Sequence, residues 1–128
     1  MEFSKGEQIW DFVHLDDIAN ALYFMAKKGR DGAIYSVGSG NARPLKEYLK
    51  VLCEKLGNFE KAEFGKIPYS DSQIMHLEAD ISELQRDTGW KPNIEFEKGI
   101  EEVIEFYKEW KKCWEKKYLE LRKEVEGS

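Results

Sequence analysis

The stretch "QIWDFVHLDD", residues 8–17, passes from apolar to acidic and contains one of the two histidines of the chain. Residues 9–14 include Ile, Trp, Phe and Val in an alternating pattern, which favours a short β-strand. Asp16 and Asp17 then supply oxygens that can cap a helix N-terminus. The stretch therefore predicts a strand that leads directly into a helix, while His14 beside the two aspartates raises the alternative of a metal or catalytic site.

The predicted helix runs to about Lys28, where Gly29 ends it. Its apolar face consists of Ile18, Ala19, Leu22, Met25 and Ala26. The following string "GAIYSVGSG", residues 32–40, predicts a second strand over residues 33–37, buried on both sides.

Pro44 begins a second predicted helix, which Gly57 ends. Residues 62–67 then form a loop or a third strand. The string "DISELQRDTG", residues 80–89, predicts a short helix. In that helix Asp80 is the cap, Glu83 occupies the capping-box position and Gly89 is the stop. Trp90 follows as an expected anchor in the core.

The last helical pattern starts near Glu97 and continues almost to the end of the chain. Its apolar residues recur at steps of three, four or seven, namely Ile100, Val103, Ile104, Tyr107, Trp110, Trp114, Leu121 and Val125. About 30 helical residues extend roughly 45 Å, more than the width of a domain of this size. We therefore expect the far half to project, to bend back or to pack against another chain.

This order of elements predicts an α/β fold, with a small parallel-stranded β-α-β-α-β unit followed by helices and a long C-terminal helix. A chain of 128 residues can form one ordinary domain. We divide it into a main segment, residues 1–110, and a helical extension, residues 111–128.

Composition excludes several classes of protein. The net charge of -5 disfavours nucleic-acid binding, which needs a basic surface. No apolar run is long enough to cross a membrane and no signal peptide precedes the first strand, so we expect a cytoplasmic location and no membrane partner.

The two cysteines of the chain, Cys53 and Cys113, lack metal-ligand spacing and lie in helical patterns.

Each candidate site has a simpler structural interpretation. A metal site would need a third ligand near His14, and the only other histidine, His76, has no spacing relation to it. We therefore favour a structural histidine and no metal.

The glycines of "VGSGN", residues 37–41, could cradle a phosphate, but the GxGxxG pattern is incomplete because Arg43 occupies the last position. An ordinary tight turn is favoured. Two Tyr-x-x-x-Lys strings, residues 23–27 and 107–111, lie inside amphipathic helices and are attributed to chance, so no catalytic residue is assigned. The polar loop that begins with Tyr69 and Ser70 is equally consistent with a binding loop and with a solvated one.

Five stretches together carry a resemblance to a known family. They are "GEQIWDFVHLDDIANAL", "GAIYSVGSG", "PLKEYL", "FGKIPYSDSQIMHLEADISEL" and "TGWKPNIEFEKGIEEVIEFYKEW". In this order and spacing, over about residues 5–110, they resemble the C-terminal part of extended short-chain dehydrogenases, the NAD-dependent epimerase/dehydratase family acting on nucleotide sugars. The Trp in "QIWDF" and the string "IPYSDSQ" are most similar to the deoxysugar branch, that of CDP-abequose synthase-like proteins.

The resemblance implies a nucleotide-sugar-binding segment that is not catalytic alone. The family's glycine fingerprint for NAD(P) and its catalytic Tyr-x-x-x-Lys precede the matching region, so no cofactor site is expected in this chain, which begins at Met1 as a truncated product or a separate domain would.

The resemblance also implies where a substrate would be held. Trp10 stands where many epimerases have an arginine that grips the substrate diphosphate, and an indole could stack on a base or sugar instead. Tyr69 and Ser70 occupy the loop in which a second family arginine usually lies, and Arg43 and Lys66 are the nearest cations in the sequence. These five residues are the expected substrate-binding set. The alternative is a non-catalytic α/β module that self-associates into a homo-oligomer through residues 107–125.

Overall fold

The computed structural model describes residues 1–126, apart from the side chains at positions 121 and 123–126. Three two-residue strands form one sheet in the order β2-β1-β3, with β1 antiparallel to β2 and parallel to β3. The elements are β1 (Ile9–Trp10), α1 (Leu15–Lys28), β2 (Arg43–Pro44), α2 (Leu45–Lys55), a 3-10 turn η1 (Phe59–Lys61), β3 (His76–Leu77), α3 (Ser82–Thr88) and α4 (Phe96–Glu126). The α/β class and the long C-terminal helix are confirmed, but the sheet is mixed rather than parallel.

The predicted strand over residues 33–37 is wrong, because this segment joins no β-ladder among the described residues. Its residues do alternate: Tyr35 and Val37 pack against the core, whereas Ile34 is 91% exposed. The segment is therefore buried on one side only. A strand pattern specifies which side chains point inward, but ladder formation also needs a neighbouring strand.

The junction of strand and helix also differs from the expectation. The β1 ladder ends at Trp10, four residues earlier than predicted. His14, not an aspartate, is the N-cap of α1, and its Nδ1 accepts a hydrogen bond from the backbone N–H of Asp16 at 3.2 Å. Asp17 is 3% exposed and accepts hydrogen bonds from the backbone N–H groups of Asn93 and Ile94 at 2.8–3.0 Å. It therefore fastens α1 to the segment before α4.

The core lies between α1 and α3. Its buried members are Ala21, Ile81, Leu84 and Trp90, with Phe24, Met25, Tyr35, Val37 and Ala79 packed against them. Trp90 is fully buried, so its predicted role as an anchor is confirmed. The predicted apolar face of α1 is shifted, because Leu22 is 60% exposed while Ala21 is fully buried.

Helix α3 ends as expected at Gly89, which has a φ of +73° and lies in the left-handed region. Asp80 accepts a hydrogen bond from the backbone N–H of Ser82, as a capping residue does. Glu83 does not complete a capping box; its carboxylate pairs with Arg30 from the loop that follows α1. Arg30 also pairs with Asp87 at 3.0 Å, so ionic contacts reinforce the packing of α1 against α3.

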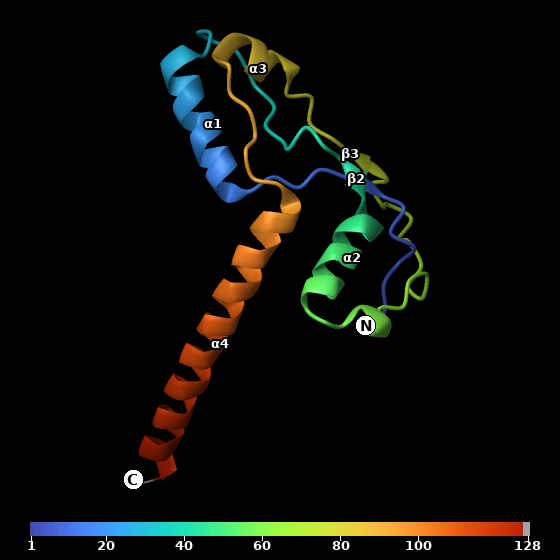
Figure 1. Cartoon of the computed structure of the whole chain (residues 1–128), viewed down its shortest axis with the longest axis vertical. Helices are drawn as coiled ribbons and strands as arrows, with labels where there is room; N and C mark the ends of the chain where they lie inside the picture. The colour runs from blue at the N-terminus through green and yellow to red at the C-terminus, as the bar shows by residue number, and fades with distance from the viewer. Residues whose placement is uncertain (127–128) are drawn as a thin grey trace.

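Helix α4 leaves the rest of the molecule near its first turns and extends away from it (Figure 1). At its base, Ile104 is buried and Glu101 pairs with Lys55 of α2. Beyond that point its side chains are exposed up to Glu120. Of the three arrangements expected for the far half, this chain therefore shows projection. Within residues 1–126, no helix combines the length and apolar composition needed to cross a bilayer.

Candidate functional site

The sheet brings two predicted substrate residues together. Trp10 of β1 and Arg43 of β2 are directly opposite each other in the antiparallel register, so their side chains lie on the same face of the sheet. The indole Nε1–H of Trp10 donates to the backbone carbonyl of Ile74 at 3.0 Å, which fixes the ring next to β3. These two residues are 33 positions apart in the chain and meet only through the ladder.

Arg43 is not a free cation. Its Nη1 donates to Glu97 at 2.6 Å, and its guanidinium lies 4.7 Å from the ring centroid of Tyr48. The hydrogen bond to Glu97 raises the pKa of Arg43 and lowers the pKa of Glu97, so both groups are charged at neutral pH. The Nε atom of Arg43 is buried and has no partner among the described residues.

An open cavity of about 480 Å³ is lined by Arg43 and Glu97, but not by Trp10. Its lining combines aromatic rings, polar side chains and one cation already neutralised by a carboxylate. The lining residues are Phe12, Ser39, Asn41, Arg43, Tyr48, Pro92, Asn93, Ile94, Glu95, Phe96 and Glu97. A hydroxyl-bearing ring fits such a lining better than a bare anion, because rings stack on aromatic faces and hydroxyls bond to amides and carboxylates.

Of the five predicted substrate residues, only Arg43 lines this cavity, and Trp10, Lys66, Tyr69 and Ser70 do not. Tyr69 accepts a hydrogen bond from the backbone N–H of Glu7 at 3.0 Å, so its hydroxyl fastens the loop to the segment before β1. Ser70 is exposed in the same loop. Lys66 is exposed and lies 3.6 Å from Glu63. The structure thus places Trp10 opposite Arg43 in the sheet, and it places Lys66, Tyr69 and Ser70 in other contacts.

Phe12 and Glu97 belong to this site but were not among the predicted substrate residues. Phe12 alternates with Trp10 along the extended segment, and that spacing of two could have placed both rings on one side. Glu97 is 54 positions from Arg43, and only the tertiary packing of the first turn of α4 beside α2 and β2 brings it there. No local pattern in the sequence pairs these two charges.

The glycine loop that could have held a cofactor phosphate is filled by the chain itself. The Asp11 carboxylate accepts hydrogen bonds from the backbone N–H and the hydroxyl of Ser39. A Cβ built on Gly38 would lie 2.3 Å from Asp11 Oδ2 and 2.6 Å from Ala79 Cβ. A carboxylate therefore already occupies the place of an anion, and this loop does not fit the phosphates of NAD(P).

His14 is committed to structural contacts. Besides capping α1, it has its Nε2 3.4 Å from Glu102 of α4. Among the described residues, no three His, Cys, Asp or Glu side chains gather as metal ligands would. Of the two Tyr-x-x-x-Lys strings, the first is a surface stack, with the Lys27 ammonium 4.9 Å from the Tyr23 ring centroid.

Comparisons with known proteins match both sequence and fold. A family model described as the NAD dependent epimerase/dehydratase family matches residues 1–38. A CDP-abequose synthase of Salmonella typhimurium is 36% identical over 106 residues, which cover 79% of this chain and 35% of that protein. A dTDP-glucose 4,6-dehydratase of Shigella flexneri is 31% identical over 111 residues, or 82% of this chain and 31% of that protein.

Solved structures of enzymes with related names share the fold of this chain. An ADP-L-glycero-D-manno-heptose-6-epimerase of Helicobacter pylori aligns with a TM-score of 0.68 at 28% identity, over 83% of this chain and 32% of that one. A UDP-glucose 4-epimerase of Thermotoga maritima, solved with UDP-glucose, aligns with a TM-score of 0.75 at 22% identity, over 85% of this chain and 35% of that one. The chain thus spans about a third of the length of the relatives it matches.

Proposed function

Since this chain is a relative of the NAD-dependent epimerase/dehydratase family and spans about a third of its matched members, we propose that it forms a nucleotide-sugar-binding segment of such an enzyme. The observation that carries the proposal is the sequence match over most of the chain to enzymes named for dTDP-glucose and CDP-abequose. These names differ in base and in sugar. The shared chemistry is a nucleoside diphosphate joined to a hexose.

Within this proposal, Trp10 is the main contact for the base or the sugar. Its ring is fixed by the hydrogen bond to Ile74 and needs no reordering to stack on a ligand. Arg43, on the same face of the sheet, contributes through its pair with Glu97 and not as a free diphosphate ligand. Lys66, Tyr69 and Ser70 are proposed as outer contacts from the neighbouring segment. We propose that the substrate role belongs to residues 1–110 and that residues 111–128 take no part in it.

The redox step of the family is proposed to depend on residues outside this chain. The Asp11 carboxylate in the glycine loop supports this, because it would repel the phosphates of a dinucleotide. The chain alone is therefore expected neither to bind NAD(P) tightly nor to turn over a nucleotide sugar.

Calorimetric titration with dTDP-glucose, UDP-glucose and CDP-glucose tests the proposal. We expect binding of at least one of them, weakened about tenfold or more by Trp10→Ala through loss of the stacking surface. Trp114→Ala, an exposed tryptophan on α4, is the matched control and should leave the affinity unchanged. Turnover by the purified chain with NAD+, or binding that Trp10→Ala leaves intact, would contradict the assignment.

A second candidate function is that of a self-associating module. It is favoured by the exposed aromatic side chains of α4, since contiguous apolar surface of this kind marks association sites. Light scattering tests it: we expect a molar mass above that of one chain. The two functions are compatible, because they use different parts of the molecule.

A further inference from the structure

The projecting part of α4 carries a regular apolar stripe. Val103, Tyr107, Trp110 and Trp114 follow one another at steps of four, three and four residues, and they are 43%, 61%, 47% and 57% exposed. Neighbouring rings touch along the stripe, with centroids 6.1 Å apart for Tyr107 and Trp110 and 5.7 Å for Trp110 and Trp114. Alternating steps of four and three residues place two apolar residues in every seven, as in the seam of a coiled coil.

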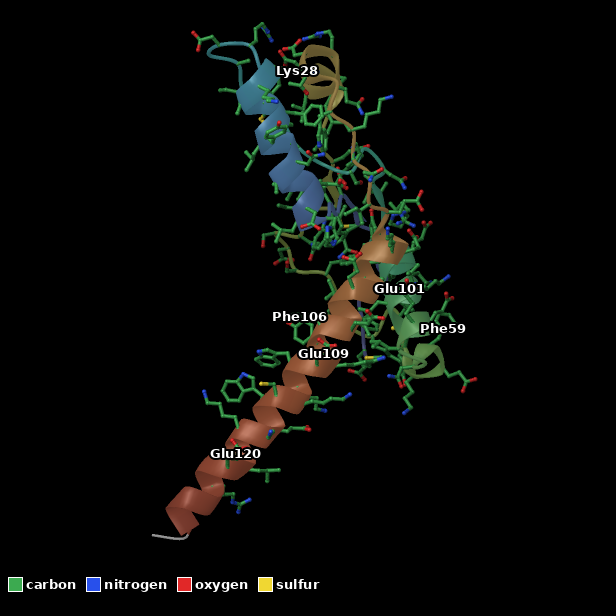
Figure 2. The ribbon with its side chains drawn as sticks, turned by 60° about the vertical axis from the view of Figure 1, so that its left-hand side comes forward. Lys28, Phe59, Glu101, Phe106, Glu109 and Glu120 are labelled. Carbon is green, nitrogen blue, oxygen red and sulfur yellow. The ribbon has the colours of Figure 1, made fainter. Side chains whose placement is uncertain are left out.

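Val103 lies beside the body, whereas Tyr107, Trp110 and Trp114 are about half exposed or more. Figure 2 shows Phe106, a neighbour of the stripe, pointing to a different side of α4 from Glu101, which faces α2. Glu120 lies further along the helix, beyond every other element in this view. The stripe begins at Val103, next to the buried Ile104 at the base of α4, and continues beyond it.

The next seam position after Trp114 is Lys117, which is exposed and polar. A single lysine in an apolar seam selects between helix orientations. In a parallel pair, each seam residue meets its own copy, and Lys117 would face Lys117 of the second chain. In an antiparallel pair centred at position 112, Lys117 faces Tyr107 of the second chain and Trp110 faces Trp114.

We propose that a second copy of this chain covers the stripe, with the two α4 helices antiparallel and the twofold axis near position 112. This inference rests on the self-association proposed above and adds its surface and its register. The ammonium of each Lys117 lies over the ring of Tyr107 from the other chain, which is a favourable cation–π contact. Two Trp110–Trp114 contacts form the centre of the interface.

The area available is sufficient for a specific dimer. Tyr and Trp side chains bury about 150–250 Å² each when covered completely. About half of each ring is exposed here, so the three rings of the two copies contribute roughly 600 Å². With Val103 and the flanking stems of Lys and Glu, the total reaches about 1,000 Å², the lower bound of specific interfaces.

Sedimentation equilibrium of the full chain at about 50 μM tests the interface. We expect a dimer, and Trp110→Ala should raise its Kd about 30-fold or more, because tryptophans at interface centres dominate affinity. Leu119→Ala is the matched control, since Leu119 is 55% exposed on the opposite side of the same helix. That variant should change Kd by less than about threefold. Circular dichroism of both variants checks that the helix remains.

A charge series tests the register. In the antiparallel pair, Tyr107→Glu places a carboxylate opposite Lys117 and should weaken the dimer by no more than about tenfold. Adding Lys117→Glu places two carboxylates face to face and should weaken it a further 100-fold or so. In a parallel pair, positions 107 and 117 do not meet, so the second change would add nothing.

The outcomes separate the two proposals. A chain that stays monomeric overturns both self-association and the pairing of α4. A dimer that is indifferent to Trp110→Ala preserves self-association and overturns the α4 interface. A dimer that is sensitive to Trp110→Ala, but shows no coupling between positions 107 and 117, overturns the antiparallel register.

Discussion

At the scale of single residues, Asp17 shows how position along the chain misleads about a role. Its place in the first turn of α1 indicates a cap, and a carboxylate there is favourable on electrostatic grounds. In the structure it is buried and satisfies two backbone N–H groups from residues 93 and 94. The same carboxylate therefore connects the beginning of the chain with the segment that positions α4.

Asp17→Ala should lower the free energy of unfolding by about 2–4 kcal/mol, because it leaves two backbone N–H groups without an acceptor. Asp17→Asn keeps one acceptor oxygen and should cost about half as much. Urea unfolding measures both. Asp16→Ala is the control: its side chain is 76% exposed, so we expect a change of about 0.5 kcal/mol. Equal effects at positions 16 and 17 would refute the connecting role.

Asp87 gives the packing of α1 against α3 a dependence on pH. The hydroxyl of Tyr35 donates to its carboxylate at 2.9 Å and Arg30 lies at 3.0 Å, and these contacts lower the pKa of Asp87. Because the pKa of Asp87 is lower in the folded than in the unfolded chain, its charged form stabilises the fold. This stabilisation is complete above the unfolded pKa of about 3.9, and it is lost as the pH falls through the pKa of the folded chain.

Thermal melting between neutral and acidic pH tests this linkage. The wild-type chain should lose thermal stability steeply below about pH 4, and Asp87→Asn should lower Tm at pH 7 and flatten that loss. Asp71→Asn, at an exposed loop position, is the matched control and should leave the profile unchanged. A steep acid limb in Asp87→Asn would show that other carboxylates dominate.

At the scale of elements, the C-terminal ends of the helices are determined locally, and the strands are not. Gly29, Gly57 and Gly89 follow the last turns of α1, α2 and α3, as the sequence predicts. By contrast, the alternation in residues 33–37 yields no strand, since a ladder requires a partner that local sequence does not supply. The prediction that residues 33–37 are buried on both sides was also wrong, since no neighbouring element among the described residues covers the side of Ile34.

Gly89→Ala isolates the cost of a left-handed helix end. An added Cβ would meet no atom within 4 Å, so the penalty comes only from the φ of +73°. We expect a loss of about 1 kcal/mol, and a smaller loss for Gly89→Asn, because asparagine tolerates this conformation better. Chemical denaturation measures both. A cost of Gly89→Ala near zero would mean that the helix ends elsewhere in solution.

At the scale of the whole molecule, the body and the distal part of α4 depend on different contacts. The body has a buried core between α1 and α3. The distal part of α4 has no such core among the described residues of its own chain, and most of a helix's stability in water comes from tertiary packing. Its helicity should therefore depend on association, and not on the stability of the body.

Dilution of the chain tests whether the helicity of distal α4 depends on association. Far-ultraviolet circular dichroism should show less helix per residue as the chain is diluted below the Kd of the dimer, while near-ultraviolet signals of the buried Trp90 persist. Trp110→Ala should show the low-helix signal already at high concentration, and Leu119→Ala should behave as the wild type. Helicity that is independent of concentration would argue against the paired helix.

The sequence by itself determined the features that depend on neighbours along the chain: the helices and their glycine ends, the length of α4 and the anchor Trp90. It also carried the family resemblance, because several motifs in a fixed order are specific even where each motif alone is weak. Only the tertiary structure decided which side of α1 is buried, that Arg43 is neutralised by Glu97, and that Asp11 fills the glycine loop. Each of these joins residues far apart in the chain, and such contacts arise from packing and charge in three dimensions, which no local pattern encodes.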